Sequence, residues 1–196
     1  MANCISLEDI DHNLGCSGNV SGIAPRLIYG YHSDVAAWPD EPLPTDANTP
    51  LSLEESATLE GDVLMKAGTL AFALDFTEDS GSLTIVPQGE IDGGQMEYTL
   101  TIVKAKLQAK ILGLMNAALG KKLFFIVQDE NGLTYLMGNR HRGCTFVTGG
   151  DGATTGASSS DRNQASLQFK FRQGRAFVYN GDVENILEIT PVAPVP

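Results

Sequence analysis

Stretches in which apolar and polar residues alternate recur along the chain and predict β-strands. The clearest lie at 82–86 and 95–103, where Thr, Val, Ile and Tyr occupy positions that strands favour. Further strands are expected at 26–32, 62–76, 123–128, 133–138, 144–148, 165–172 and 176–179. The segments between them are rich in Gly, Asn, Asp and Ser, which tolerate tight or left-handed backbone. The pattern therefore indicates a mostly-β chain.

One segment has the period of a helix instead. Over 105–119, apolar residues recur at spacings of three and four, while Lys106 and Lys110 fall on the other flank. The apolar stripe consists of Leu107, Ile111, Leu114, Met115, Ala118 and Leu119. Gly120 stands where a left-handed end is expected, and Lys121 and Lys122 complement the negative end of the helix. We expect the stripe to face the core.

A hairpin is predicted directly after this helix. The segments LFFIVQ and LTYLMG flank Asp129-Glu130-Asn131-Gly132, and Asn-Gly between alternating hydrophobic residues is a strong hairpin signal. Both Asn131 and Gly132 are expected to adopt the positive φ of that turn class.

Several strands, one helix and several more strands predict an antiparallel β-sandwich or barrel with one flanking α-helix. At 196 residues the chain suits one domain. We expect an N-terminal arm at 1–22, a domain at 23–190 and a Pro-rich tail at 191–196. Within the domain, a Pro-rich loop at 38–50 and a Gly/Ser-rich loop at 148–164 are expected to leave the sheets.

The loop at 38–50 carries four prolines in thirteen residues and the chain's one tryptophan, Trp38. A lone Trp beside such a loop fills the edge of its own core about as often as it anchors a partner. The basic cluster Arg140-His141-Arg142 fits either a docking site for an acidic neighbour or a solvated turn. The candidate assembly residues are Trp38, Pro39, Pro42, Leu43, Pro44, Arg140 and Arg142.

The net charge of −11 is divided unevenly along the chain. Up to Val103 there are 17 acidic and 2 basic side chains, whereas from Lys104 onward there are 7 and 11. General nucleic-acid binding needs basic groups that displace counterions, so the acidic half argues against that function. Acid that merely keeps an abundant protein soluble is an equally good interpretation of the composition.

Motifs that carry chemistry are missing. There is no GxSxG, the three histidines sit beside polar loops or at strand ends, and the run Gly149–Gly156 lacks the GK[ST] ending of a phosphate loop. Cys4, Cys16 and Cys144 form no CxxC pair, and whether Cys4 and Cys16 join is open. The sequence predicts no enzyme, no cofactor and no metal site.

No apolar stretch approaches the roughly 20 residues that span a bilayer. The segment MANCISLEDIDHN has neither the basic nor the apolar region of a secretion signal. We therefore expect neither a membrane span nor secretion.

A series of motifs runs along most of the chain. They begin with Cys4, Cys16, Gly22-Ile23 and the strand RLIYGY, and continue with the strand and helix MEYTLTIVKAKLQAKILGLMNAAL. A hairpin of the type VEDxNGxxYLxG follows, as IVQDENGLTYLMG from Ile126 to Gly138. The end of the pattern is matched by Thr155-Gly156, Asp161-Arg162-Asn163 and ASLQFKF, with Gln164 where glycine is usual.

Together these motifs resemble those of a family of structural proteins from tailed bacteriophages. This resemblance implies a virion protein that is assembled in the host cytoplasm and contacts other virion proteins. Within a virion, the chain is similar to tail tube subunits in its length, its sandwich with a flanking helix, its N-terminal arm and its long early loop. Such subunits stack as hexameric rings around a channel. Genomic DNA passes through that channel without specific binding. Acid that lines such a channel would repel phosphate and let DNA slide. A head-tail connector ring or a capsid decoration protein is the alternative, and a carbohydrate-binding module is the best reading outside virions.

Overall fold

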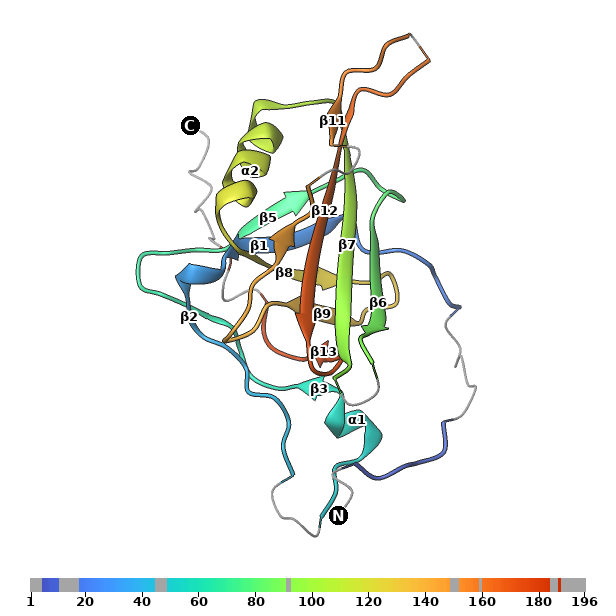
Figure 1. The fold of residues 1–196 in the computed structure, drawn as a ribbon, viewed down its shortest axis with the longest axis vertical. Coiled ribbons are helices and arrows are strands. Elements are labelled where there is room, and N and C mark those ends of the chain that lie inside the picture. The colour runs from blue at the N-terminus through green and yellow to red at the C-terminus, as the bar shows by residue number, and fades with distance from the viewer. Residues whose placement is uncertain are drawn as a thin grey trace, which may run out of the picture.

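The computed structural model describes residues 5–10, 18–44, 49–90, 93–148, 152–158, 160–183 and 187. The described chain is mostly β, with antiparallel sheets packed as a sandwich and one longer helix against its side (Figure 1). The predicted fold class is therefore confirmed. No helix in this part of the chain is long and apolar enough to cross a bilayer.

Two sheets form the sandwich. The first has the order β5 (Phe72–Asp75), β1 (Arg26–Tyr31), β8 (Leu123–Gln128) and β9 (Thr134–Met137). The second has the order β10 (Thr145–Phe146), β12 (Gln164–Gln173), β7 (Gln95–Ala105) and β6 (Ser82–Gln88), with β11 (Ala153–Thr154) also paired to β12. Two small pairs lie beside them: β2 (Val35–Ala37) with β4 (Leu64–Met65), and β3 (Thr58–Leu59), which is parallel to β13 (Val178–Tyr179).

The long strands β7 and β12 show why alternation produces this sheet. Buried and partly exposed residues alternate along β12, and the register places Leu167 opposite Ile102 and Phe169 opposite Leu100. These side chains point into the main core between the sheets, while the opposite face of the same strands is polar. Tyr98 is fully buried there, and its hydroxyl accepts hydrogen bonds from the Gln173 side chain and the Phe177 backbone at 2.9 Å each.

Strand β8 is buried on both faces, which explains its unbroken apolar run. Leu123, Phe125 and Val127 belong to the main core. Phe124 and Ile126 face a second core on the outer side of the first sheet, which the segments around β2–β4 and β13 cover. The second core also contains Ile28, Val35, Leu59, Val63, Ala71, Leu136, Phe177 and Tyr179.

The predicted helix is shorter than expected, because α2 runs from Ala109 to Gly120. Strand β7 continues to Ala105, and Lys106 takes a φ of 63°. The amides of Lys106 and Leu107 donate to the backbone and side-chain oxygens of Asn163 at 2.8 Å. Asn163 therefore fixes the turn between β7 and α2, and the helix begins only after this turn, at Ala109.

The apolar stripe of α2 is confirmed in part. Ile111, Leu114 and Ala118 are buried, and Leu107 and Met115 pack against the main core. Leu119, in contrast, is 63% exposed, so its assignment to the buried stripe was wrong.

The predicted helix end was also wrong. Gly120 is the last helical residue and has no left-handed φ, while the following Lys121 is extended at φ −136°. The chain leaves α2 directly into β8, and no reversal of direction at Gly120 is needed. Lys121 lies over the Tyr31 ring, 4.7 Å from its centroid, instead of capping the helix.

The expected long strand at 62–76 is two short strands, β4 and β5. A turn separates them, in which Thr69 donates to the Lys66 carbonyl at 2.9 Å and Gly68 has a φ of 83°. The loose alternation of apolar and polar residues therefore continues across the turn between β4 and β5, and Gly68 is the one residue in the sequence that marks this turn. Five short elements went unpredicted: a 3-10 helix at His32–Asp34, the one-turn helix α1 at Leu53–Ser56, and the strands β2, β3 and β11.

The hairpin of β8 and β9 is confirmed, with Gln128 opposite Thr134. Gly132 has a φ of 94°, but Asn131 does not share the positive φ expected for it. The Asn131 amide instead donates to the Asp129 carboxylate at 2.9 Å, and its side chain bonds both backbone groups of Val20. This asparagine therefore ties the end of the N-terminal arm to the hairpin.

Candidate functional site

Trp38 fills the edge of its own domain, which decides between the two roles left open for it. Its ring stacks on His32 with centroids 5.1 Å apart and meets Phe124 edge-on at 5.8 Å. A Cβ added at Gly138 would come within 2.9 Å of the Trp38 ring, so the close approach depends on that glycine. Trp38 thus packs on the second core.

The Pro-rich loop lies against the domain at two arginines. Arg140 forms an ion pair with Asp40 at 2.5 Å, and Arg175 contacts both the Glu41 carboxylate at 3.9 Å and the Pro42 carbonyl at 3.4 Å. Pro39, Pro42 and Pro44 are half-buried, while Leu43 is 71% exposed. Residues 45–48 of the loop lie outside the described residues.

Arg142 belongs to a different place, an open groove of about 550 Å³. The groove runs along the edge of the second sheet, between β12 and the segment from Arg142 to Thr148. Its charged lining comes from Glu97, Lys122, Arg142, Lys170 and Arg172, and the partly exposed Val147 lies beside them. Phe146 and Phe171 border the groove, but their rings belong to the main core, and Phe171 is only 1% exposed. We call this feature the basic groove.

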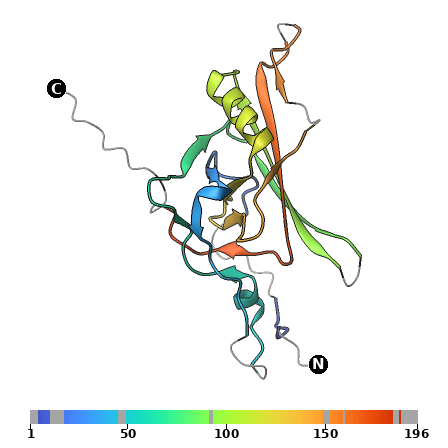
Figure 2. The same cartoon turned by 60° about the vertical axis from the view of Figure 1, so that its left-hand side comes forward.

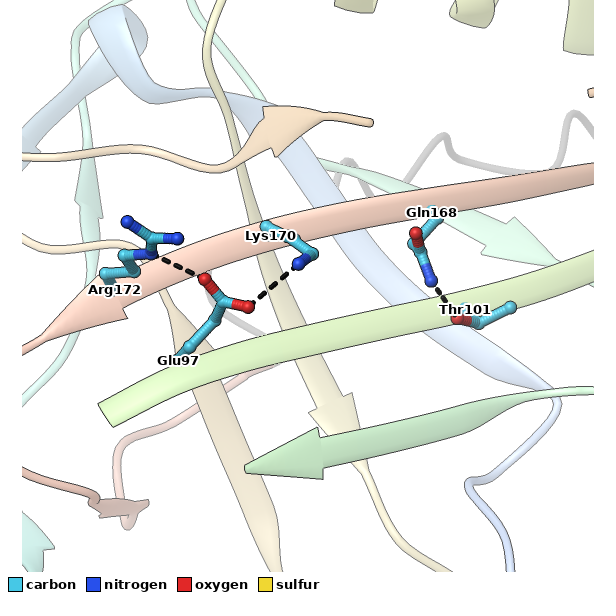
Figure 3. A network of polar contacts seen from close by, with 5 residues as sticks. All are labelled: Glu97, Thr101, Gln168, Lys170 and Arg172. Atoms are coloured by element: carbon cyan, nitrogen blue, oxygen red, sulfur yellow. Dashed lines mark hydrogen bonds and ion pairs between the residues drawn. The ribbon is translucent and has the colours of Figure 1, made fainter. Parts of the chain in front are cut away.

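A single carboxylate organises two of the cations in the basic groove (Figure 3). Glu97 accepts from Lys170 Nζ at 2.8 Å and from Arg172 Nε at 2.5 Å, and only 5% of its side chain is exposed. Hydrogen bonds from Lys170 and then Arg172 outweigh the cost of burial and lower the pKa of Glu97 below its usual value. Glu97 therefore remains ionised and holds both cations on the outer face of the sheet.

The other two cations are not neutralised in this way. Lys122 Nζ donates to the Thr145 hydroxyl at 2.7 Å, and Arg142 is positioned by its backbone amide, which donates to the Asn139 side chain at 2.9 Å. Neither forms an ion pair with any acidic residue in the described ranges. Four cations against one carboxylate give the groove an excess of positive charge in an acidic chain.

Acidic residues gather in loops instead of on the sheets. Among the described residues, Asp75 and Glu97 are the acidic side chains that lie on strands, and both are in ion pairs. Most of the described carboxylates before Lys104 therefore lie outside the strands, where they repel or attract neighbours without disturbing the sandwich.

One projection is built from two segments that are far apart in the sequence, 5–10 and 51–56. Ser6 donates its amide to the Leu51 carbonyl at 2.7 Å, and Leu53 donates to the Glu8 carboxylate at 3.2 Å. Helix α1 begins with a capping box, because Ser52 and Glu55 exchange side-chain and backbone hydrogen bonds. We call this structure the acidic lobe; its acidic side chains are Glu8, Asp9, Glu54 and Glu55.

The acidic lobe exposes large apolar side chains as well as acid. Leu7 and Ile10 are 88% and 86% exposed. In Figures 1 and 2 helix α1 lies at one end of the molecule and α2 at the other. The lobe thus combines ordered backbone with apolar and acidic side chains that its own domain does not cover.

Cysteine and metal chemistry receive no support from the described residues. Cys144 is buried, its thiol faces the Met137 carbonyl at 3.2 Å, and burial raises its pKa, which suppresses the reactive thiolate. Cys4 and Cys16, and with them the question of their pairing, lie outside the described residues. No group of three or more potential metal ligands occurs within the part of the chain that the structure describes.

The structure separates the predicted assembly residues into two groups. Trp38, Pro42 and Arg140 contact their own domain and Pro39 and Pro44 are half-buried, whereas Leu43 and Arg142 are exposed. Sequence reasoning missed Lys122, Lys170 and Arg172 as partners of Arg142 in one groove. The alternation of β12 places Lys170 and Arg172 on one face, but only the strand register brings Glu97 between them.

No protein-family model, curated protein or solved structure matches this chain. The site is therefore interpreted from its own geometry and charge.

Proposed function

We propose that the chain is a non-enzymatic structural subunit of a tailed-bacteriophage virion, the tail tube subunit, which assembles with copies of itself as stacked rings, hexameric in that family. The observation that carries the proposal is the acidic lobe. Its backbone is fixed by a capping box and by bonds between 5–8 and 51–53, yet Leu7 and Ile10 are almost fully exposed. Ordered apolar side chains that their own domain leaves uncovered are typical of a surface that meets a neighbour.

Two motifs of the phage-like pattern have architectural roles that support this proposal. Asn131 of the hairpin motif bonds Val20 of the arm, and Asn163 of the Asp-Arg-Asn motif fixes the turn before α2. Residues in such positions hold projecting segments on the sandwich. A pattern of this kind suits an assembly protein, whose function depends on the placement of its arms.

The distribution of acid is compatible with a DNA channel. Carboxylates in turns and projections can approach the axis of a ring, and within about one Debye length, roughly 8 to 10 Å, they would repel passing phosphate. Genomic DNA would then slide through without specific contacts.

Electron microscopy of the purified protein tests the proposal. Stacked rings or tubes with an acidic lumen are expected. Rings that do not stack would favour a connector, and a basic or neutral lumen would contradict the tube. Particles that remain dispersed monomers at all concentrations would contradict self-assembly and favour a binding module. Deletion of residues 1–22 is expected to leave a folded monomer that no longer stacks. The sequence alone predicts the same for deletion of 38–50, but that deletion would also remove Trp38 from the second core, so a loop deletion has to retain Trp38.

A further inference from the structure

The basic groove and the acidic lobe have complementary layouts. The groove presents the cations Lys122, Arg142, Lys170 and Arg172 beside the partly exposed Val147. The lobe has the order Leu7-Glu8-Asp9-Ile10, in which apolar residues flank acid. A contact between such surfaces would pair opposite charges and cover the exposed Leu7 and Ile10, and charge complementarity of this kind is a general feature of specific interfaces.

Neither surface contacts a patch of opposite charge within the described chain. No ion pair joins the lobe to the groove there, and Lys122 and Arg142 have no acidic partner in those ranges. The lobe is held by hydrogen bonds between its own two segments, which leave the Asp9 and Glu54 carboxylates directed to the surface. The excess charges of the two surfaces have opposite sign.

We infer that the basic groove receives the acidic lobe of a second copy of this chain. Two different patches meet in this contact, so it is heterologous and repeats from copy to copy, closing into a ring or extending as a stack. The inference rests on the proposed self-assembly and adds the two surfaces that carry it. In this contact Lys122 and Arg142 recognise the acidic lobe of the partner copy. Lys170 and Arg172, which Glu97 holds in place, belong to the same surface.

Charge reversal on each surface tests the contact. The groove variant Lys122→Glu/Arg142→Glu leaves the Glu97 network intact, and the lobe variant Asp9→Lys/Glu54→Lys leaves the bonds made by Glu8 and Glu55 intact. Each should raise the protein concentration at half-assembly about tenfold or more, as reversed charges at a close interface do. The matched control is Lys110→Glu/Arg162→Glu, which reverses two exposed cations outside the groove and changes the net charge of the chain by the same amount as the groove variant. It should shift the concentration at half-assembly less than about twofold.

Mixing the two variants gives a sharper test. Groove-defective copies retain a normal lobe, and lobe-defective copies retain a normal groove, so an equimolar mixture should form a one-contact dimer in sedimentation velocity but no long assembly. A chain that carries all four substitutions exchanges the charges at the four substituted positions but not the net charges of the two surfaces, because Lys170, Arg172, Glu8 and Glu55 remain. It should therefore assemble better than either double variant and less well than the wild type. Melting temperatures within a few degrees of the wild type establish that each variant is folded.

The outcomes separate this inference from the proposed function. If the wild type assembles and the groove variant assembles equally well, the groove contact is wrong and the assembly proposal stands. If the wild type stays monomeric at every concentration, both are overturned. If a single-stranded DNA 20-mer binds the wild type, loses binding in the groove variant, and assembly is unchanged, the groove belongs to a polyanion and the inference is overturned.

Discussion

The sandwich and the acidic lobe are stabilised in different ways. Between the sheets, side chains such as Phe169 and Leu100 are fully buried and touch across several strands. In the lobe, a two-residue contact between 5–6 and 51, a carboxylate bond and a capping box hold the backbone while Leu7 and Ile10 remain in solvent. Burial is cooperative over the domain, whereas hydrogen bonds in solvent contribute little. The lobe can therefore open without unfolding the sandwich, and a neighbour can stabilise it.

The largest expected effect concerns the sandwich. Ile111→Asp should lower the free energy of unfolding by about 4 kcal/mol or more, because it places an unpaired carboxylate between α2 and the main core. Urea denaturation measures the loss. Leu112→Asp, at the neighbouring position on the exposed side of the helix, is the control and should cost less than about 1 kcal/mol. Equal stability of the two variants would show that Ile111 of α2 does not pack in the core.

A smaller effect is expected at the polar face of the second sheet. Glu97→Gln should cost about 1 to 3 kcal/mol at pH 7, because a buried charge-assisted pair of hydrogen bonds is lost, and the figure is moderated by the partial exposure of Lys170 and Arg172. Since the pKa of Glu97 is lower in the folded than in the unfolded chain, its contribution is present above the unfolded value, about 4.3.

The pH dependence distinguishes this role from simple packing. The stability difference between wild type and Glu97→Gln should remain constant from pH 7 to about pH 5 and shrink as the pH falls through the lowered folded pKa. Chemical denaturation at a series of pH values measures it. A difference that persists unchanged well below that range would show that the ionised carboxylate is not the source.

The smallest effect is expected in the acidic lobe, where it tests directly whether the lobe and the sandwich unfold separately. Ser52→Ala removes the capping box and should destabilise α1 by about 1 kcal/mol locally. The global free energy of unfolding should change by less than about 0.5 kcal/mol, because the lobe opens separately. Hydrogen exchange of the Glu55 amide, which donates to the Ser52 hydroxyl at 3.1 Å, reports the local change. A matching global loss would show that lobe and sandwich unfold as one unit.

Much of the sheet structure could be predicted because alternation is a local consequence of burial. Period-two patterns predicted strands at 95–103 and 165–172, which the structure extends to 95–105 and 164–173, and a turn with Gly132 predicted the pairing of β8 with β9. Predictions failed where a distant partner decided the local geometry. Asn163 delays the start of α2 through Lys106 and Leu107, and the Val20 backbone binds the Asn131 side chain.

The sequence by itself determined the mostly-β fold, the buried face of α2 and the concentration of acid before Lys104, because these depend on residue type and short-range spacing. The tertiary structure decided that Trp38 packs on its own core and that Arg140 pairs with Asp40. It also decided that Arg142 and Lys122 share a groove with Lys170 and Arg172. These residues come from segments up to 50 positions apart. Their meeting depends on strand register and on the path between the two sheets, which no local pattern encodes.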